Sequence, residues 1–215
     1  WLQRDSLCLT DEQARVLDLY HQMFVRSGAR LDGAAADRMT TIKSRLAVLG
    51  TQFSQNVLAE ERDWYMQLGP DDLQGLPDFL LDATAAAGAE KGLGPILTTS
   101  RSLIVPFLQY SPHRHLRQKA YEAWVARGAN ANSQDNRAVA GEILQLRQER
   151  AHLLGYGSFA DFKLEPEMAK TPAAVRDLLM RVWAPAKAQA ERDAQVLGAM
   201  LQAEGGAGPL EPWDW

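Results

Sequence analysis

Glu149 and His152 stand three positions apart near the end of a predicted helix. A Glu-x-x-His pair on one helix face can ligate iron, but a di-iron site needs a second such pair and two further Glu residues on facing helices. The sequence contains one copy of the pair. We therefore expect His152 to be a surface or half-buried residue at a helix C-terminus, where the helix dipole favours a cation.

Two other patterns share their letters with known sites. His113 and His115 have a spacing that can bind a metal, but they follow Ser111-Pro112 at a helix start, and no third ligand is predictable nearby. A solvated turn is the better interpretation. Gly155-x-Gly157-x-x-Ala160 matches a dinucleotide-binding fingerprint, but a helix rather than a strand precedes it. A tight turn explains these glycines without a nucleotide.

The remaining candidates are a lone thiol and a group of charges. Cys8 is the only cysteine, which rules out an internal disulfide and is typical of a reducing compartment; we expect it to be a small buried or half-buried residue. Ion pairing across helices is the expected role of five charged side chains. These are Arg147, Arg150, Glu142, Glu149 and Glu165. The sequence has no H-E-x-x-H, phosphate-binding Gly-rich loop, G-x-S-x-G or C-x-x-C, so we assign no catalytic, cofactor-binding or metal-binding residue to this chain.

The segment from Asp135 to Pro172 organises the elements around these residues. Its first part has the apolar spacing of an amphipathic helix, and Gly155 is the expected end because glycine adopts the left-handed C-cap conformation most readily. Ser158 is the expected N-cap of the next helix. Thr171 and Pro172 should open a long final helix, with a kink or break near Trp183 caused by Pro185.

The first sixty residues predict two helices. Thr10 to Gln13 form a capping box, and Gly28 should end the first helix. The second helix should begin near Asp32 or Gly33. Its apolar positions are Met39, Ile42, Leu46, Leu49, Phe53 and Val57. A short linker predicts that the two helices pack as an antiparallel hairpin, and the apolar stripe is interpreted as core packing.

Residues 64–110 carry the β-favouring patterns. Residues 64–68 indicate a short strand, whereas residues 78–87 predict a helix that ends at Gly88. Residues 96–99 and 103–108 indicate a small hairpin or extended segment, in which Pro106 would place the second run at an edge. The fold class is therefore mainly α, with long antiparallel helices and a small β element at about residues 64–110. We expect residues 1–215 to be one helical fragment, divided as follows: a helical hairpin (1–62), a mixed β and loop insert (63–110), helices (111–204) and a linker (205–215).

Composition limits the classes of partner. A formal net charge of −4 gives no broad basic field and argues against nucleic acid. No run approaches the roughly 18 apolar residues needed to cross a membrane, so no membrane partner is expected. The chain begins at Trp1 and ends at Trp215, and we expect both ends to be cuts within a longer protein.

Several segments resemble a known family. These are LRQERAHLLGYGSFADFKLEPEMAKTP (146–172), DN (135–136), EPWDW (211–215), YHQMFVRSGARL (20–31) and LGTQFSQNVLAEE (49–61). Together they resemble the thimet oligopeptidase family of zinc metallopeptidases, and within it the bacterial peptidyl-dipeptidase branch. The resemblance implies a cytoplasmic hydrolase that shortens small peptides by C-terminal dipeptides, with zinc held by two His and a Glu around an H-E-x-x-H motif that follows the W-D motif. This chain would form part of the substrate-channel wall, bind no zinc and be inactive without the C-terminal catalytic part.

The alternative is a non-enzymatic helical scaffold or protein-binding module. The apolar seam from Met39 to Val57 and the aromatic residues near Trp64 would then dock a partner. If the chain is instead part of a larger peptidase, it should expose an apolar patch, with Trp213 and Trp215 near it.

Overall fold

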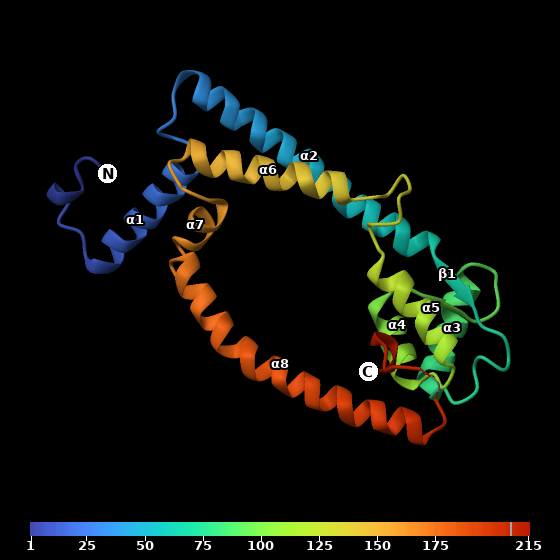
Figure 1. The fold of residues 1–215 in the computed structure, drawn as a ribbon. Helices are drawn as coiled ribbons and strands as arrows, with labels where there is room; N and C mark the ends of the chain where they lie inside the picture. The colour runs from blue at the N-terminus through green and yellow to red at the C-terminus, as the bar shows by residue number, and fades with distance from the viewer. Residues whose placement is uncertain (207) are drawn as a thin grey trace. The chain divides into compact units, whose positions relative to one another are not determined.

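The computed structural model describes residues 1–206 and 208–215; Ala207, in the predicted linker, lies outside the described residues. In this part of the chain we observe eight α-helices and one two-stranded sheet, which confirms the mainly α fold class (Figure 1). The chain forms two compact units. Unit 1 comprises Trp1–Gly50 and Gly141–Arg176, and unit 2 comprises Thr51–Ala140 and Asp177–Trp215. Of the helices described, none is long and apolar enough to cross a membrane.

Unit 1 begins with a 3₁₀ turn, η1 (Arg4–Ser6), followed by α1 (Asp11–Arg26). The predicted capping box is present: Thr10 Oγ1 accepts from the Gln13 amide at 3.3 Å, and Gln13 Oε1 accepts from the Thr10 amide at 3.0 Å. Both bonds satisfy amides that the first helical turn leaves without partners. The local sequence therefore fixes where α1 starts.

Two long helices, α2 (Gly33–Asp63) and α6 (Arg137–Leu153), lie side by side in Figure 1. In unit 1, Arg38 pairs with Glu149 and Arg45 pairs with Glu142, each with an N–O distance of 2.6 Å. The earlier arginine, Arg38, pairs with the later glutamate, and Arg45 pairs with the earlier one. The two helices are therefore antiparallel. Of the predicted stripe on α2, Met39, Ile42 and Leu49 are buried, and Leu46 and Val57 are half-buried, whereas Phe53 is exposed.

The predicted hairpin of the first two helices (1–62) stays a prediction. No residue of α1 is buried, so α1 is not the element that covers the α2 stripe. Helix α6 takes that place, through the ion pairs described above.

The turn after α6 follows the sequence prediction. Gly155 has φ +85°, a left-handed conformation that side chains with a Cβ adopt at a cost. Ser158 Oγ then accepts from the Asp161 amide at 3.1 Å and caps α7 (Phe159–Leu164). Thr171 Oγ1 accepts from the Ala174 amide at 3.2 Å at the start of α8 (Pro172–Ala203).

Helix α8 continues through Pro185, so the break that was one form of the prediction near Trp183 is absent, while a kink there stays a prediction. A proline inside a helix removes the bond to the carbonyl four residues earlier, here Arg181. Pro185 and Arg181 are both exposed, so water can satisfy that carbonyl. The loss of one backbone bond does not end the helix.

In unit 2, strand β1 (Tyr65–Gln67) pairs antiparallel with β2 (Ile96–Thr98), with Tyr65 opposite Thr98. The sheet packs with three helices, α3 (Asp78–Glu90), α4 (Arg101–Tyr110) and α5 (Arg114–Val125). Their shared core contains Leu80, Leu97, Ile104 and Phe107, all fully buried. Phe107, Leu97 and Leu80 come from different elements, so this core holds unit 2 together.

Residues 103–108 lie in α4, so the predicted hairpin or extended edge is wrong for this run. Leu103, Ile104 and Phe107 lie on one helix face and are all buried, and this burial outweighs the β propensity of the run. Pro106 is accommodated inside α4, where it removes one backbone bond.

Gly88 does not end α3, which runs on to Glu90. A Cβ at Gly88 would lie 1.9 Å from the carbonyl oxygen of Gly94. Glycine is therefore required here because the following loop crosses the helix at very short range.

Exposed apolar side chains are most numerous on helices α1 and α8. On α1 the exposed apolar residues include Val16, Tyr20, Met23 and Phe24. On α8 they include Leu178, Leu179, Val182, Trp183, Val196 and Met200. Trp215 is exposed as well, whereas Trp213 is half-buried with its ring edge against Tyr121. Exposed apolar surface of this kind marks a place where further protein can pack.

Candidate functional site

A polar cavity of about 300 Å³ opens in unit 2, between the end of α2, the end of β2 and the loop after α5. We call it the Glu60 pocket. Its lining residues are Glu60, Asp63, Trp64, Thr99, Ala123, Arg127, Asn130, Asn132 and Gln134. The mixture of charged, amide and aromatic side chains is typical of sites that orient a small polar group.

Glu60 is the buried charge of this pocket, with only 7% of its surface exposed. Oε2 accepts from the Gly128 amide, and Oε1 accepts from Nδ2 of Asn130 at 2.9 Å and from Nδ2 of Asn132 at 3.2 Å. Burial raises the pKa of Glu60, but these three hydrogen bonds outweigh it and hold the pKa below its ordinary value. Glu60 is therefore ionised at neutral pH, and the three donors named above are uncharged groups.

The other two charged side chains in the wall of the pocket are already paired. Arg127 pairs with Glu61, and Asp63 pairs with Arg62 at 2.7 Å. Thr99 is only 1% exposed, and its Oγ1 has no hydrogen-bond partner among the described residues. A buried hydroxyl without a partner is rare in proteins. The described part of the pocket therefore lacks a group that would hydrogen-bond to the Thr99 hydroxyl.

A second polar constellation in unit 2 anchors residues 211–215 to the start of α5. Arg114 and Arg117 both donate to Asp214 in the 3₁₀ turn η2 (Pro212–Asp214), and Arg117 Nε also donates to the Trp213 carbonyl oxygen at 2.8 Å. Hydrogen bonds from Arg114 are the main cause that lowers the pKa of Asp214 to about 2. These residues, predicted as the end of a linker, are thus held by charge-assisted hydrogen bonds.

In unit 1, Arg26 joins the end of α1 to the segment after α6. Its guanidinium donates to the Phe162 carbonyl oxygen at 2.6 Å, pairs with Glu165 and lies 4.1 Å from the Phe162 ring centroid. The Tyr156 hydroxyl donates to the same Glu165 carboxylate at 2.5 Å. The arrangement fixes the turn around Gly155 in place.

The profile of Peptidase family M3 matches residues 107–215, which is just over half of the chain. The chain belongs to peptidase family M3. The resemblance to thimet oligopeptidases is thereby confirmed at the level of the family. The anchor made by Arg114, Arg117 and Asp214 lies inside the matched range.

Relatives of this M3 chain extend the similarity over its whole length. It is 29% identical to the dipeptidyl carboxypeptidase of Escherichia coli (strain K12) over 221 aligned residues, which cover 100% of this chain and 32% of that protein. The dipeptidyl carboxypeptidase of Salmonella typhimurium is 31% identical, with 100% and 32% covered. Oligopeptidase A of Salmonella typhimurium is 34% identical, with 96% and 31% covered. The chain therefore spans about a third of the length of these relatives.

The structure separates the predicted metal candidates of the M3 chain. Glu149 pairs with Arg38, whereas His152 Nε2 lies 3.1 Å from the Gly157 carbonyl oxygen. His113 Nε2 lies 3.0 Å from the Asp71 carbonyl oxygen, and its ring centroid is 6.1 Å from that of His115. Across residues 1–206 and 208–215, no group of three or more His, Cys, Asp or Glu side chains is placed to hold a metal ion.

The predicted ion pairs form with other arginines than expected. Glu142, Glu149 and Glu165 pair with Arg45, Arg38 and Arg26. Arg147 and Arg150 instead lie over aromatic rings, at 5.4 Å from the Phe159 centroid and 5.1 Å from the Phe162 centroid. Cation–π contacts thus take the place of the expected salt bridges.

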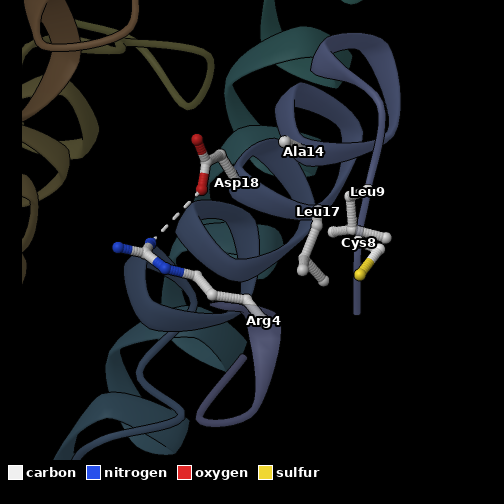
Figure 2. Close-up of a pocket in the computed structure, with 6 residues that line it drawn as sticks. All are labelled: Arg4, Cys8, Leu9, Ala14, Leu17 and Asp18. Atoms are coloured by element: carbon white, nitrogen blue, oxygen red, sulfur yellow. Dashed lines mark ion pairs between the residues drawn. The ribbon is translucent and has the colours of Figure 1, made fainter. Parts of the chain in front are cut away.

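Cys8 lines a shallow cavity of about 430 Å³ at the start of unit 1. Figure 2 shows Arg4 and Asp18 paired on one side, with Cys8, Leu9 and Leu17 grouped on the other. Cys8 is exposed, so the prediction of a buried or half-buried thiol is wrong. A reactive thiol needs a positioned base or cation. The charged groups in this view pair with each other rather than with the thiol.

Sequence reasoning missed Glu60, Thr99 and Asp214. One signal was available: Asp214 stands between two tryptophans. A carboxylate inside an apolar stretch has to be paired if it is buried. Its partners come from distant segments and cannot be read from the local pattern.

Proposed function

We propose that this chain is one helical piece of a zinc-dependent oligopeptidase of the peptidyl-dipeptidase type, acting in the cytoplasm. The similarity to two dipeptidyl carboxypeptidases along 100% of the chain is the observation that carries this proposal. The parent enzyme would release C-terminal dipeptides from short peptides. Within the piece we keep the predicted division into residues 1–62, 63–110, 111–204 and 205–215.

The zinc of such an enzyme has no fitting ligand set in this chain. The described residues hold no cluster of three or more metal-binding side chains, and the sequence has no H-E-x-x-H motif. We therefore derive no reaction step through zinc here. In our proposal the metal and the residues that activate water belong to the catalytic part of the parent protein, and the 215-residue chain alone is inactive.

The role we propose for the chain is structural: its helices supply part of the wall of the substrate channel. Two observations support this role. Helices α1 and α8 carry exposed apolar side chains, including Phe24 and Trp183, that further protein can cover. The relatives are also about three times as long as this chain, so they contain ample additional protein.

The proposal is tested by comparing the 215-residue chain with its full parent protein on a short peptide of defined sequence. We expect the parent to contain one zinc per chain and to release C-terminal dipeptides. Peptide cleavage should stop after treatment with a chelator. We expect neither zinc nor cleavage for the isolated chain. Stoichiometric zinc and peptide trimming by the isolated chain would overturn the assignment.

A non-enzymatic helical scaffold remains the second candidate. The exposed apolar faces of α1 and α8 favour it equally, because they would serve to dock a partner protein. The two candidates differ in one measurement: a parent protein without zinc and without peptidase activity would support the scaffold and exclude the enzyme.

A further inference from the structure

We propose that the Glu60 pocket binds a primary ammonium group of a peptide, either its amino terminus or a lysine side chain. The pocket lies wholly within unit 2 and is lined by residues between 60 and 134. The geometry of the pocket supports an ammonium site independently of the proposed function. Its identification as a peptide subsite rests in addition on the proposed function.

The charge of the pocket favours a cation. The other charged side chains of the lining, Asp63 and Arg127, pair with neighbours of opposite sign. Glu60 is buried and accepts only from neutral donors. A buried carboxylate that keeps its charge without a cationic partner is electrostatically unfavourable, and an entering cation relieves that cost.

Counting hydrogen bonds indicates an ammonium rather than a simple ion. Both lone pairs of Glu60 Oε1 are used by Asn130 and Asn132, whereas Oε2 accepts one bond and retains one lone pair. Thr99 Oγ1 is buried and accepts from no described donor. An ammonium group has three N–H donors and no acceptor, so in our proposal it donates to Glu60 Oε2 and, after a small movement of the wall, to the buried Thr99 Oγ1.

The other wall residues fit the part of the ligand that carries the ammonium group. Trp64 and Ala123 contribute apolar surface to the same cavity. A volume of about 300 Å³ exceeds that of one amino group and has room for the adjoining carbon atoms. A bare divalent cation fits less well, because no three carboxylate, His or Cys side chains among the described residues converge on one point.

Binding is measured by NMR titration of the 215-residue chain, following the Gly128 amide and the Trp64 indole. The probes are n-butylammonium, tetramethylammonium (the same charge without N–H donors), Ala-Ala-Ala-amide and its N-acetylated form, and N-acetyl-lysine amide. We expect n-butylammonium and Ala-Ala-Ala-amide to shift both signals. Tetramethylammonium and N-acetyl-Ala-Ala-Ala-amide should bind at least about tenfold more weakly, since they lack the donors.

The peptide probes also distinguish the two sources of the ammonium. Tighter binding of Ala-Ala-Ala-amide than of N-acetyl-lysine amide supports a site for the amino terminus, and the reverse order supports a site for a lysine side chain. Equal binding of n-butylammonium and tetramethylammonium, or no binding of either, would overturn the proposal. These outcomes do not depend on peptidase activity, so failure of the proposed function remains distinguishable from failure of this one.

Variants of the chain provide the second test. Thr99→Val keeps the side-chain shape and removes a buried hydroxyl that has no protein partner, so the fold should be retained while n-butylammonium binding weakens about tenfold. Glu60→Gln should weaken it further by removing the charge. Thr98→Val is the matched control, because the Thr98 hydroxyl accepts from the Ser100 amide and does not line the pocket. Unchanged binding in folded Thr99→Val would contradict the assignment.

Discussion

Nη2 of Arg114 lies 2.7 Å from Oδ2 of Asp214, and Nε of the same arginine lies 2.9 Å from Oδ1. The two residues are a hundred positions apart in the sequence, and the Asp214 side chain is only 3% exposed. Arg117 adds a further bond to Oδ1 at 2.9 Å. Because the anion is buried and held by two cations, it fixes the last residues of the chain on the start of α5.

Replacing Asp214 should destabilise unit 2 strongly. In Asp214→Ala the guanidinium groups of Arg114 and Arg117 lose their buried partner, and removing one member of such a network costs about 3 kcal/mol. Urea unfolding followed by circular dichroism measures this loss. Glu191→Ala is the control, because Glu191 forms an exposed pair with Lys187 and should leave the unfolding midpoint unchanged. Equal midpoints for the two variants would contradict the anchor.

The same carboxylate predicts a pH dependence of stability. The pKa of Asp214 falls from its ordinary value of 3.8 to about 2 in the folded chain, chiefly through the hydrogen bonds from Arg114. A lowered pKa means that its stabilisation is present above about pH 4 and is lost as the pH falls toward 2. The difference in unfolding free energy between the wild type and Asp214→Ala should therefore shrink over this interval. Unfolding curves at half-unit pH steps check it, and a constant difference would refute the assignment.

Features set by neighbouring residues were predictable from the sequence. The caps at Thr10, Ser158 and Thr171 and the left-handed turn at Gly155 each depend on residues within five positions, and all are present. The strand near Tyr65 was also predicted correctly. A local hydrogen bond or a positive φ favours particular residue types at neighbouring positions, and these can be recognised in the sequence.

Features set by distant residues were not predictable. Residues 103–108 favour a strand by propensity, but burial of Ile104 and Phe107 against α3 and β2 makes them a helix. The Glu60 pocket joins a helix end to amide side chains 70 positions later. The spacing of apolar residues along the sequence does not indicate which distant loop places Asn130 beside the buried Glu60 carboxylate. The site residues therefore emerge only from the packed structure.

Two glycines inside helices should respond in opposite directions to alanine. In Gly88→Ala the new Cβ meets the Gly94 carbonyl oxygen at 1.9 Å, so the backbone has to move and unit 2 should lose stability. In Gly141→Ala nothing lies within 4 Å of the new Cβ in α6, so the better helix propensity should add about 0.5–1 kcal/mol. Thermal unfolding of both variants checks the contrast. Stabilisation by Gly88→Ala would show that the close approach to Gly94 is absent.

Two arginines of unit 1 that each pair with a glutamate should contribute differently to stability, because one is buried and the other is exposed. The Arg26 side chain is 14% exposed and bonds to Glu165 and to the Phe162 carbonyl oxygen, whereas the Arg38 side chain is 45% exposed and bonds to Glu149. Arg26→Ala removes the guanidinium that bonds to the Phe162 carbonyl oxygen and pairs with Glu165, leaves Glu165 with the bond from Tyr156, and uncovers the Phe162 ring, so we expect a loss of about 2 kcal/mol. Arg38→Ala should have no measurable effect, because water replaces the guanidinium at an exposed site. Hydrogen exchange at the Phe162 and Glu165 amides adds a local readout: exchange should accelerate in Arg26→Ala only. Equal acceleration in both variants would mean that the turn around Gly155 is held by the whole α2–α6 pair and not by Arg26.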